Sequence, residues 1–147
     1  MSYVEAFLDE IRSWVGTPYR TRMNRQSKQG GTNCAQYVQF ALEAALPPGE
    51  VPIVEFNHVR LIRTRENVGV PFLLQFCHEV SFDEIEPGDI AILEIAGLPV
   101  QPAVYMGDKW FIFCTVALGV YQDYLPEHDK LLYVLRPNIF DLEKQGT

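Results

Sequence analysis

The chain has 147 residues, which suits one domain and is too short for two of ordinary size. Hydrophobic residues make up 48% and charged residues 21%, a balance typical of a globular protein with one core. Twelve basic and nineteen acidic side chains give a net charge of −7. This charge argues against a nucleic-acid partner, because phosphate binding needs a basic surface. We therefore expect one domain over residues 1–147.

Three features of the sequence bear on its compartment and cofactors. The first ten residues carry acidic side chains where a secretory signal needs a basic start and an apolar run, and no apolar run is long enough to span a bilayer. The cysteines, Cys34, Cys77 and Cys114, are odd in number and far apart, which favours neither a disulfide framework nor a metal site. We expect a protein that is cytoplasmic, or exported without a cleavable signal, with no membrane insertion, metal or cofactor.

The N-terminal third predicts helices. Residues 3–15 place apolar side chains in one stripe at helical spacing, and Gly16 and Pro18 end that pattern. Residues 20–33 form a polar, basic loop, and a largely buried helix is expected from about Cys34 to Leu46, stopped by two prolines. A short exposed helix is expected within residues 57–66.

The C-terminal half predicts strands. Short apolar runs lie between turn residues at 90–93, 103–106, 110–113 and 131–135. Gly107-Asp108 is expected to form the turn of a hairpin between the second and third of these runs. Helices first and an antiparallel sheet afterwards is an α+β arrangement.

Cys34 is the main candidate for chemistry. It follows a polar loop at the start of a predicted helix, where the positive end of the helix dipole favours the thiolate. A thiolate is a competent nucleophile when a base lies beside it. The alternative is that this cysteine is a small apolar residue at a helix start.

The context of Cys34 resembles the NlpC family of cell-wall thiol peptidases. Four segments occur in the family's order: Trp14-Val15-Gly16-Thr17-Pro18-Tyr19; Asn33-Cys34-Ala35 after a Gly30-Gly31 loop; Glu86-Pro87-Gly88-Asp89-Ile90-Ala91-Ile92-Leu93; and Val104-Tyr105-Met106-Gly107. They are similar to the family's G-T-P-Y, D-C-S, Q-P-G-D-L-V-F-F and I-Y-L-G segments, and the resemblance covers roughly residues 10–125. It implies a papain-like core, in which N-terminal helices pack on an antiparallel sheet of about five strands.

The resemblance also implies a mechanism, in which the cysteine attacks an amide of a peptidoglycan peptide. A histidine on a strand is the base and a further polar residue orients it. These positions fall on Gln101 and Phe113, twelve residues apart as in the family. Glutamine cannot take the thiol proton, and phenylalanine cannot hold an imidazole tautomer. Tyr19 is retained beside the implied cleft, whereas Asn33 and Ala35 replace the family's Asp and Ser.

Two functions therefore remain open. The first is a weak or inactive relative that keeps the cleft as a peptide- or acyl-binding or assembly module. The second is an active thiol amidase or peptidase on peptidoglycan-type peptides with an unconventional base, for which His58, His78 and His128 are the available histidines. Small peptidases of this type also occur in phage tails and secreted bacterial effectors, and the sequence does not choose among these settings or indicate an oligomeric state.

Overall fold

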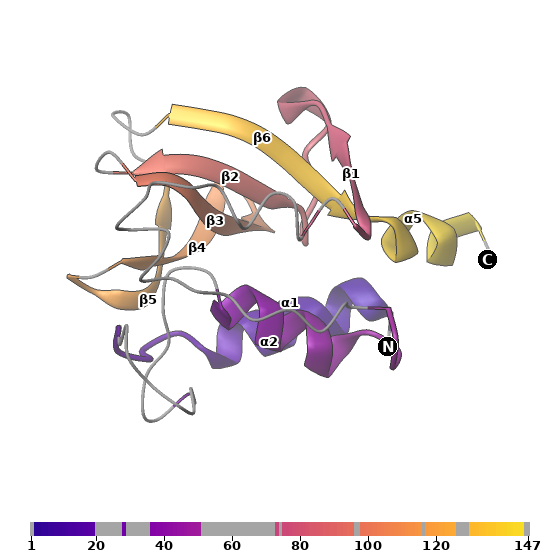
Figure 1. Cartoon of the computed structure of the whole chain (residues 1–147), viewed down its shortest axis with the longest axis horizontal. Coiled ribbons are helices and arrows are strands. Elements are labelled where there is room, and N and C mark those ends of the chain that lie inside the picture. Colours follow the sequence, from indigo (N-terminus) through magenta and orange to yellow (C-terminus); the bar gives the residue numbers. More distant parts are fainter. Residues whose placement is uncertain are drawn as a thin grey trace.

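The computed structural model describes residues 2–19, 28, 36–50, 73, 75–95, 98–115, 117–125 and 130–145. Within these residues, two helices come first, a six-stranded antiparallel sheet follows, and a short helix comes last (Figure 1). This order confirms the expected α+β class.

The two N-terminal helices form where the apolar spacing predicts them. Helix α1 spans Tyr3–Ser13, and the Ser2 hydroxyl caps it by accepting the backbone N–H of Glu5 at 3.1 Å. Helix α2 spans Gln36–Ala45. The predicted first turn of the second helix at Cys34 and Ala35 lies outside the described residues, as does the expected helix at 57–66.

The sheet has the strand order β1-β6-β2-β3-β4-β5. Its strands are β1 (Cys77–Val80), β2 (Ile90–Ile95), β3 (Leu98–Gly107), β4 (Trp110–Thr115), β5 (Gly119–Tyr124) and β6 (Lys130–Pro137). A short 3-10 helix, η1 (Phe82–Glu84), connects β1 to β2, and helix α5 (Asn138–Gln145) follows β6 directly. The last strand in the sequence therefore lies between the first two.

The sheet has six strands where about five were expected. The four predicted apolar runs lie in β2, β3, β4 and β6. β1, β5 and α5 were not predicted from the sequence. β1 is only four residues long, and β5 has the sequence Gly-Val-Tyr-Gln-Asp-Tyr, with too few apolar residues to stand out as a strand.

Side chains alternate between the two faces of the sheet and form two cores. The helix-side core lies between the sheet and the helices, and includes Phe7, Ile11, Tyr37, Leu42, Ile92 and Ile112. The outer-face cluster consists of Ala91, Leu93, Ala103, Phe111 and Phe113. Because neighbouring residues of β2 and β4 fall into different cores, the outer-face cluster lies on the face turned away from α1 and α2 (Figure 1).

None of the helices within the described ranges is long and apolar enough to cross a bilayer.

Candidate functional site

Tyr37 joins the beginning of α2 to the two strands that carry positions 101 and 113. Its side chain is fully buried, and its hydroxyl lies 2.7 Å from the carbonyl oxygen of Pro102 in β3 and 3.1 Å from that of Ile112 in β4. Pro102 directly follows Gln101, and Ile112 directly precedes Phe113. The first described turn of α2 therefore packs at the place on the sheet where the sequence puts the candidate site.

The strands β3 and β4 separate at this place. Their described pairs are Gly107 with Trp110, Tyr105 with Phe111, and Val104 with Ile112, and within the described strands no pair lies beyond the last of these. The Tyr37 hydroxyl contacts the carbonyl of Ile112, which belongs to the last pair, and that of Pro102, which lies two residues past it on β3. A side chain from α2 thus provides a hydrogen bond that the sheet itself does not make there.

A two-residue turn connects β3 to β4, as expected. Asp108 and Lys109 both have positive φ, 52° and 69°, which is the geometry of a type I′ hairpin turn. The predicted pair Gly107-Asp108 is one residue early, since Gly107 still pairs with Trp110. The hairpin itself confirms that residues 98–107 and 110–115 are neighbouring antiparallel strands.

The positions of the implied base and orienting residue are occupied as follows. The backbone of Gln101 lies in β3 opposite Leu93 of β2, and its side chain lies outside the described part of the structure. Phe113 is 1% exposed and belongs to the outer-face cluster, where its ring stacks on Tyr121 with 5.6 Å between centroids. Its neighbours Ile112 and Cys114 belong to the helix-side core.

The segment before the polar loop is tied to the edge of the sheet. The N–H of Gly16 donates to the carbonyl of Val120 at 2.8 Å, and the N–H of Val120 donates to the carbonyl of Thr17 at 2.9 Å. Tyr19 is partly buried against the helix-side core. Cys34, Asn33 and Ala35 lie outside the described residues, so the arrangement around the thiol stays a prediction.

Gly119 is required for this contact. Its φ is +68°, and a Cβ added there would lie 2.2 Å from the carbonyl oxygen of Thr17. Only glycine lets the backbone of β5 approach the Thr17 segment so closely.

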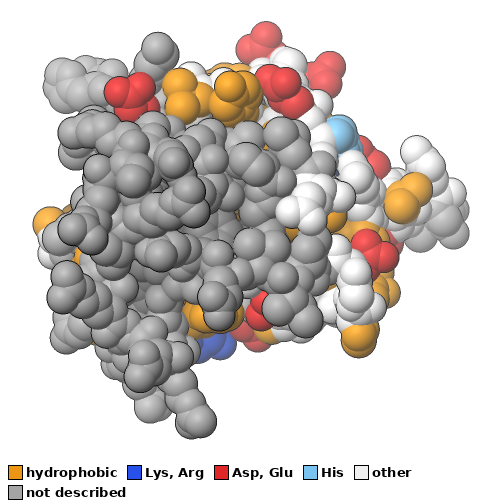
Figure 2. All heavy atoms as spheres, in the orientation of Figure 1, with side chains coloured by type: hydrophobic (Ala, Val, Ile, Leu, Met, Phe, Trp, Pro, Cys, Tyr) orange, Lys and Arg blue, Asp and Glu red, His pale blue; other side chains and the backbone are white. Residues whose placement is uncertain are grey.

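His78 is the only histidine in the described residues, and both its ring nitrogens have partners. Nδ1 lies 2.5 Å from Oδ1 of Asn138, and Nε2 lies 3.0 Å from the Asp141 carboxylate, both at α5. Acidic side chains gather at this end of the molecule, near β1 and α5 (Figure 2). These contacts give His78 a role in holding α5 against β1. His58 and His128 lie outside the described residues.

Cys77 and Cys114 are buried, with 5% and 2% exposure. Burial raises the pKa of the Cys77 thiol, and the nearby Asp89 carboxylate raises it further. Cys77 is thus a neutral thiol at physiological pH, unsuited to nucleophilic attack.

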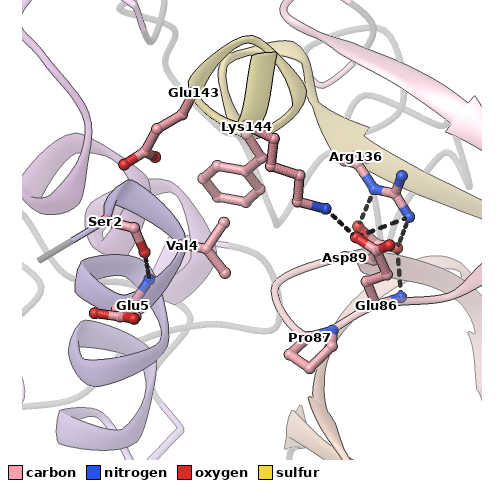
Figure 3. A pocket seen from close by; sticks show the side chains of 10 residues that line it. Ser2, Val4, Glu5, Glu86, Pro87, Asp89, Arg136, Glu143 and Lys144 are labelled. Carbon is pink, nitrogen blue, oxygen red and sulfur yellow. Dashed lines mark hydrogen bonds and ion pairs between the residues drawn. The ribbon is translucent and has the colours of Figure 1, made fainter. Parts of the chain in front are cut away.

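A cavity of about 430 Å³ lies between the beginning of α1, the turn before β2, and α5 (Figure 3). At its edge, Arg136 of β6 makes two short contacts with the Asp89 carboxylate, at 2.8 and 2.9 Å. The hydrogen bond to Asp89 raises the pKa of Arg136. Lys144 pairs with Glu86 beside it, so both cations that line this cavity are already neutralised by carboxylates. The cavity is a structural junction between α5 and the sheet.

Asp89 ends the Glu86-Pro87-Gly88-Asp89 segment, and its partner was missed by sequence reasoning. The carboxylate also accepts the backbone N–H of Glu86 at 2.9 Å, which closes the turn. A signal was present, because Arg136 follows directly on the apolar run 131–135, and a basic residue that is buried there needs a carboxylate. Within the described ranges, no group of three or more His, Cys, Asp or Glu side chains is arranged to hold a metal ion.

Helices that pack on one face of an antiparallel sheet define an α+β domain. Comparison with solved structures identifies the fold within this class. RipD from Mycobacterium tuberculosis, described as a non-catalytic NlpC/p60 domain protein adapted to peptidoglycan binding, has 14% identity and a TM-score of 0.57, with 92% of this chain and 98% of RipD covered. The chain has the NlpC/P60 fold.

Two further solved structures support the same fold. The P60 domain of antigen MAP1204 from Mycobacterium avium subspecies paratuberculosis has 12% identity and a TM-score of 0.61, covering 92% of this chain and 93% of that domain. The peptidoglycan hydrolase RipB from M. tuberculosis has 15% identity and a TM-score of 0.56, covering 91% of this chain and 64% of RipB. No protein-family model matches the sequence, and a search of curated proteins gives no significant match.

Proposed function

We propose that this chain is an NlpC/P60-fold domain that binds a peptide of the peptidoglycan type without hydrolysing it. One observation carries the proposal. The hairpin β3–β4 supplies the two strands on which the resemblance places the base and the orienting residue, and these positions hold Gln101 and Phe113.

The chemistry of these two residues supports an inactive site. A glutamine amide does not accept a proton from a thiol at neutral pH, and the loss of a general base costs about 10²–10⁴-fold in rate. Phe113 has no polar group with which to orient a base, and its ring lies in the outer-face cluster, so it does not face the beginning of α2. The described histidine, His78, is engaged at α5.

The elements around the site support a retained cleft. Tyr37 fixes the beginning of α2 to β3 and β4, and the Gly16–Thr17 segment is hydrogen-bonded to β5. A scaffold held by such contacts keeps a defined surface at the helix start even where the base is absent. The description of RipD as non-catalytic and adapted to peptidoglycan binding shows that this fold accommodates such a function.

The test combines binding and turnover on one ligand, a soluble peptidoglycan stem peptide. We expect the purified chain to bind it in a calorimetric titration and to release no product detectable by mass spectrometry after prolonged incubation. Hydrolysis that disappears in the Cys34→Ala variant would show an active enzyme with an unconventional base. Absence of binding would contradict the proposed ligand class.

A matched pair of variants tests the assignment of position 101. Gln101→His restores a base at the implied position, whereas His78→Gln removes the histidine at α5. We expect any gained hydrolysis in Gln101→His to require Cys34, and His78→Gln to leave binding unchanged. Loss of peptide binding in His78→Gln, with the fold intact by circular dichroism, would place the ligand at α5 instead.

A further inference from the structure

The outer face of the sheet carries a cavity of about 410 Å³. Its lining is almost entirely apolar and includes Phe82, Ile85, Tyr105, Phe111, Tyr124 and Leu125. Phe111 belongs to the outer-face cluster, and Tyr105 packs against that cluster. The cavity is therefore on the face turned away from α1 and α2, and it is separate from the site at the beginning of α2. Its size is that of pockets that hold small organic ligands.

The aromatic side chains form a buried floor and an exposed rim. Phe111 is 3% exposed and packs at a tilt against Tyr105, with 5.1 Å between centroids. Phe82 and Tyr124 are 46% and 52% exposed, and Tyr124 is held in place by stacking on Trp110 at 4.0 Å. The exposed ring of Phe82 at the rim leaves apolar area that a ligand ring would cover.

Among the described residues, Lys109 is the one charged side chain that lines the cavity. Within the described residues its ammonium group has no carboxylate partner, whereas Lys28, Arg136 and Lys144 each have one. The lysine is in the left-handed region at φ 69°, at a turn position that glycine occupies most easily. A bulky residue there costs stability, so its presence calls for another reason, and an unpaired ammonium at the rim of an apolar cavity supplies one.

We propose that this cavity binds a small aromatic carboxylic acid. The ring lies on Phe111 and Tyr105 beside Phe82, and the carboxylate pairs with the Lys109 ammonium. An apolar pocket with one well-placed polar group is the usual design of a small-molecule site. Charge complementarity at Lys109 selects an anion, and the aromatic walls select a ring, since aromatic pairs attract beyond the area that they bury.

The surroundings limit the size of the charge effect. Five acidic residues are next to lining residues in the sequence, Asp83, Glu84, Glu86, Asp108 and Asp123, and the chain as a whole carries −7. Lys109 is exposed, so its attraction to a carboxylate is partly screened by water. We therefore expect the ring to supply most of the affinity, and the charge to supply a factor of about five to ten.

The probe is 3-phenylpropionate, and its uncharged control is 3-phenylpropanamide. Titration of the ¹⁵N-labelled chain should shift the backbone amides of Tyr105, Lys109, Phe111 and Tyr124 with a dissociation constant in the millimolar range. The amide should bind about five- to tenfold more weakly at the same residues. If 3-phenylpropanamide bound as tightly as 3-phenylpropionate, the carboxylate would have no role in binding. If octanoate bound as tightly as 3-phenylpropionate, the aromatic ring would have none. Shifts confined to other residues would overturn the site.

Two variants in the same turn separate ligand binding from turn strain. Lys109→Gly relieves the left-handed lysine and removes the ammonium, so we expect a higher melting temperature together with five- to tenfold weaker binding of 3-phenylpropionate. Asp108→Gly relieves the neighbouring left-handed residue, and should raise the melting temperature without weakening binding. Unchanged binding in Lys109→Gly would contradict the proposal. Cys34→Ala should leave this binding unchanged, because the cavity does not depend on the function proposed for the helix start.

Discussion

At the scale of single residues, Asp89 connects a local turn to a distant strand. Its carboxylate is 1% exposed, receives the N–H of Glu86, and pairs with Arg136 through both oxygens. The arginine also donates to the carbonyl of Glu84 at 3.1 Å. A carboxylate this deeply buried is stable only with such partners, so the Pro-Gly-Asp turn and the end of β6 depend on each other.

We expect Arg136→Leu to destabilise the fold by about 3–5 kcal/mol, because it leaves the Asp89 carboxylate buried without its cation. Urea denaturation followed by circular dichroism measures the change. Lys144→Leu is the control, since the pair of Lys144 with Glu86 is about half exposed and its loss should cost less than about 1 kcal/mol. Equal losses in both variants would contradict the burial argument.

A pH dependence follows from Cys77. The unfolded thiol ionises above a pH of about 8.5, whereas burial keeps the folded thiol protonated well beyond this value. Above pH 8.5 the unfolded state binds fewer protons, so the free energy of unfolding should fall by about 1.4 kcal/mol per pH unit through this one group. Cys77→Ala should lose this part of the slope between pH 9 and 10. If the free energy of unfolding fell with pH equally in the wild type and in Cys77→Ala, the Cys77 thiol would ionise in the folded state as well.

At the scale of elements, Tyr37 holds a helix to a hairpin where the hairpin opens. The tyrosine fits the apolar side of α2, which periodicity predicts well. Its hydroxyl partners come from strands 65 and 75 residues further along the chain, and no local pattern in the sequence indicates them. Sequence reasoning therefore found the helix and both strands, and missed the contact that sets their relative position.

Tyr37→Phe should destabilise the fold by about 1–3 kcal/mol, because it removes the hydroxyl that donates to the buried carbonyl of Pro102 at 2.7 Å. Chemical denaturation gives the loss, and hydrogen exchange should show faster opening near the separated ends of β3 and β4. Tyr133→Phe is the matched control, because Tyr133 is 42% exposed and its hydroxyl has access to water. A loss below about 0.5 kcal/mol in Tyr37→Phe would show that water replaces the hydroxyl.

The contact between β5 and Thr17 gives a second test at this scale. Gly119→Ala places a methyl group against the Thr17 carbonyl at a positive φ, and should cost about 2–4 kcal/mol from the combined clash and strain. Gly16→Ala is also at positive φ, but no atom lies within 4 Å of its added Cβ, so it should cost only about 1–2 kcal/mol. Thermal unfolding compares the two, and a larger loss at Gly16 would exclude the close approach at Gly119.

At the scale of the whole molecule, the order of elements is easier to predict than the face on which a residue lies. The change from helical to strand-like periodicity indicated the α+β class, and four motifs in order indicated the fold. Within β4 the faces alternate regularly, with Phe111 and Phe113 in the outer-face cluster and Ile112 and Cys114 in the helix-side core. Alternation alone does not tell which of the two faces the helices cover, so the burial of Phe113 on the outer face could not be predicted.

The three thiols provide a test of the whole arrangement. We expect native alkylation with limiting iodoacetamide to label Cys34 first, since a thiol at a helix start is the most reactive of the three. Cys77 and Cys114, at 5% and 2% exposure, should react only as the sheet opens. Their labelling rates should rise together through a denaturant series and follow global unfolding. Preferential native labelling of Cys77 or Cys114 would contradict the assignment of Cys34.

The position of β6 between β1 and β2 fixes the order in which the elements can fold during synthesis. When the chain grows from its N-terminus, β1 and β2 are complete long before residues 130–137 exist, and their facing edges have no partner until then. Helices α1 and α2 and the β2–β3–β4–β5 meander can form first, because all their residues precede β6. Unpaired strand edges invite association between chains, so premature termination before β6 should yield aggregating products rather than a smaller stable domain.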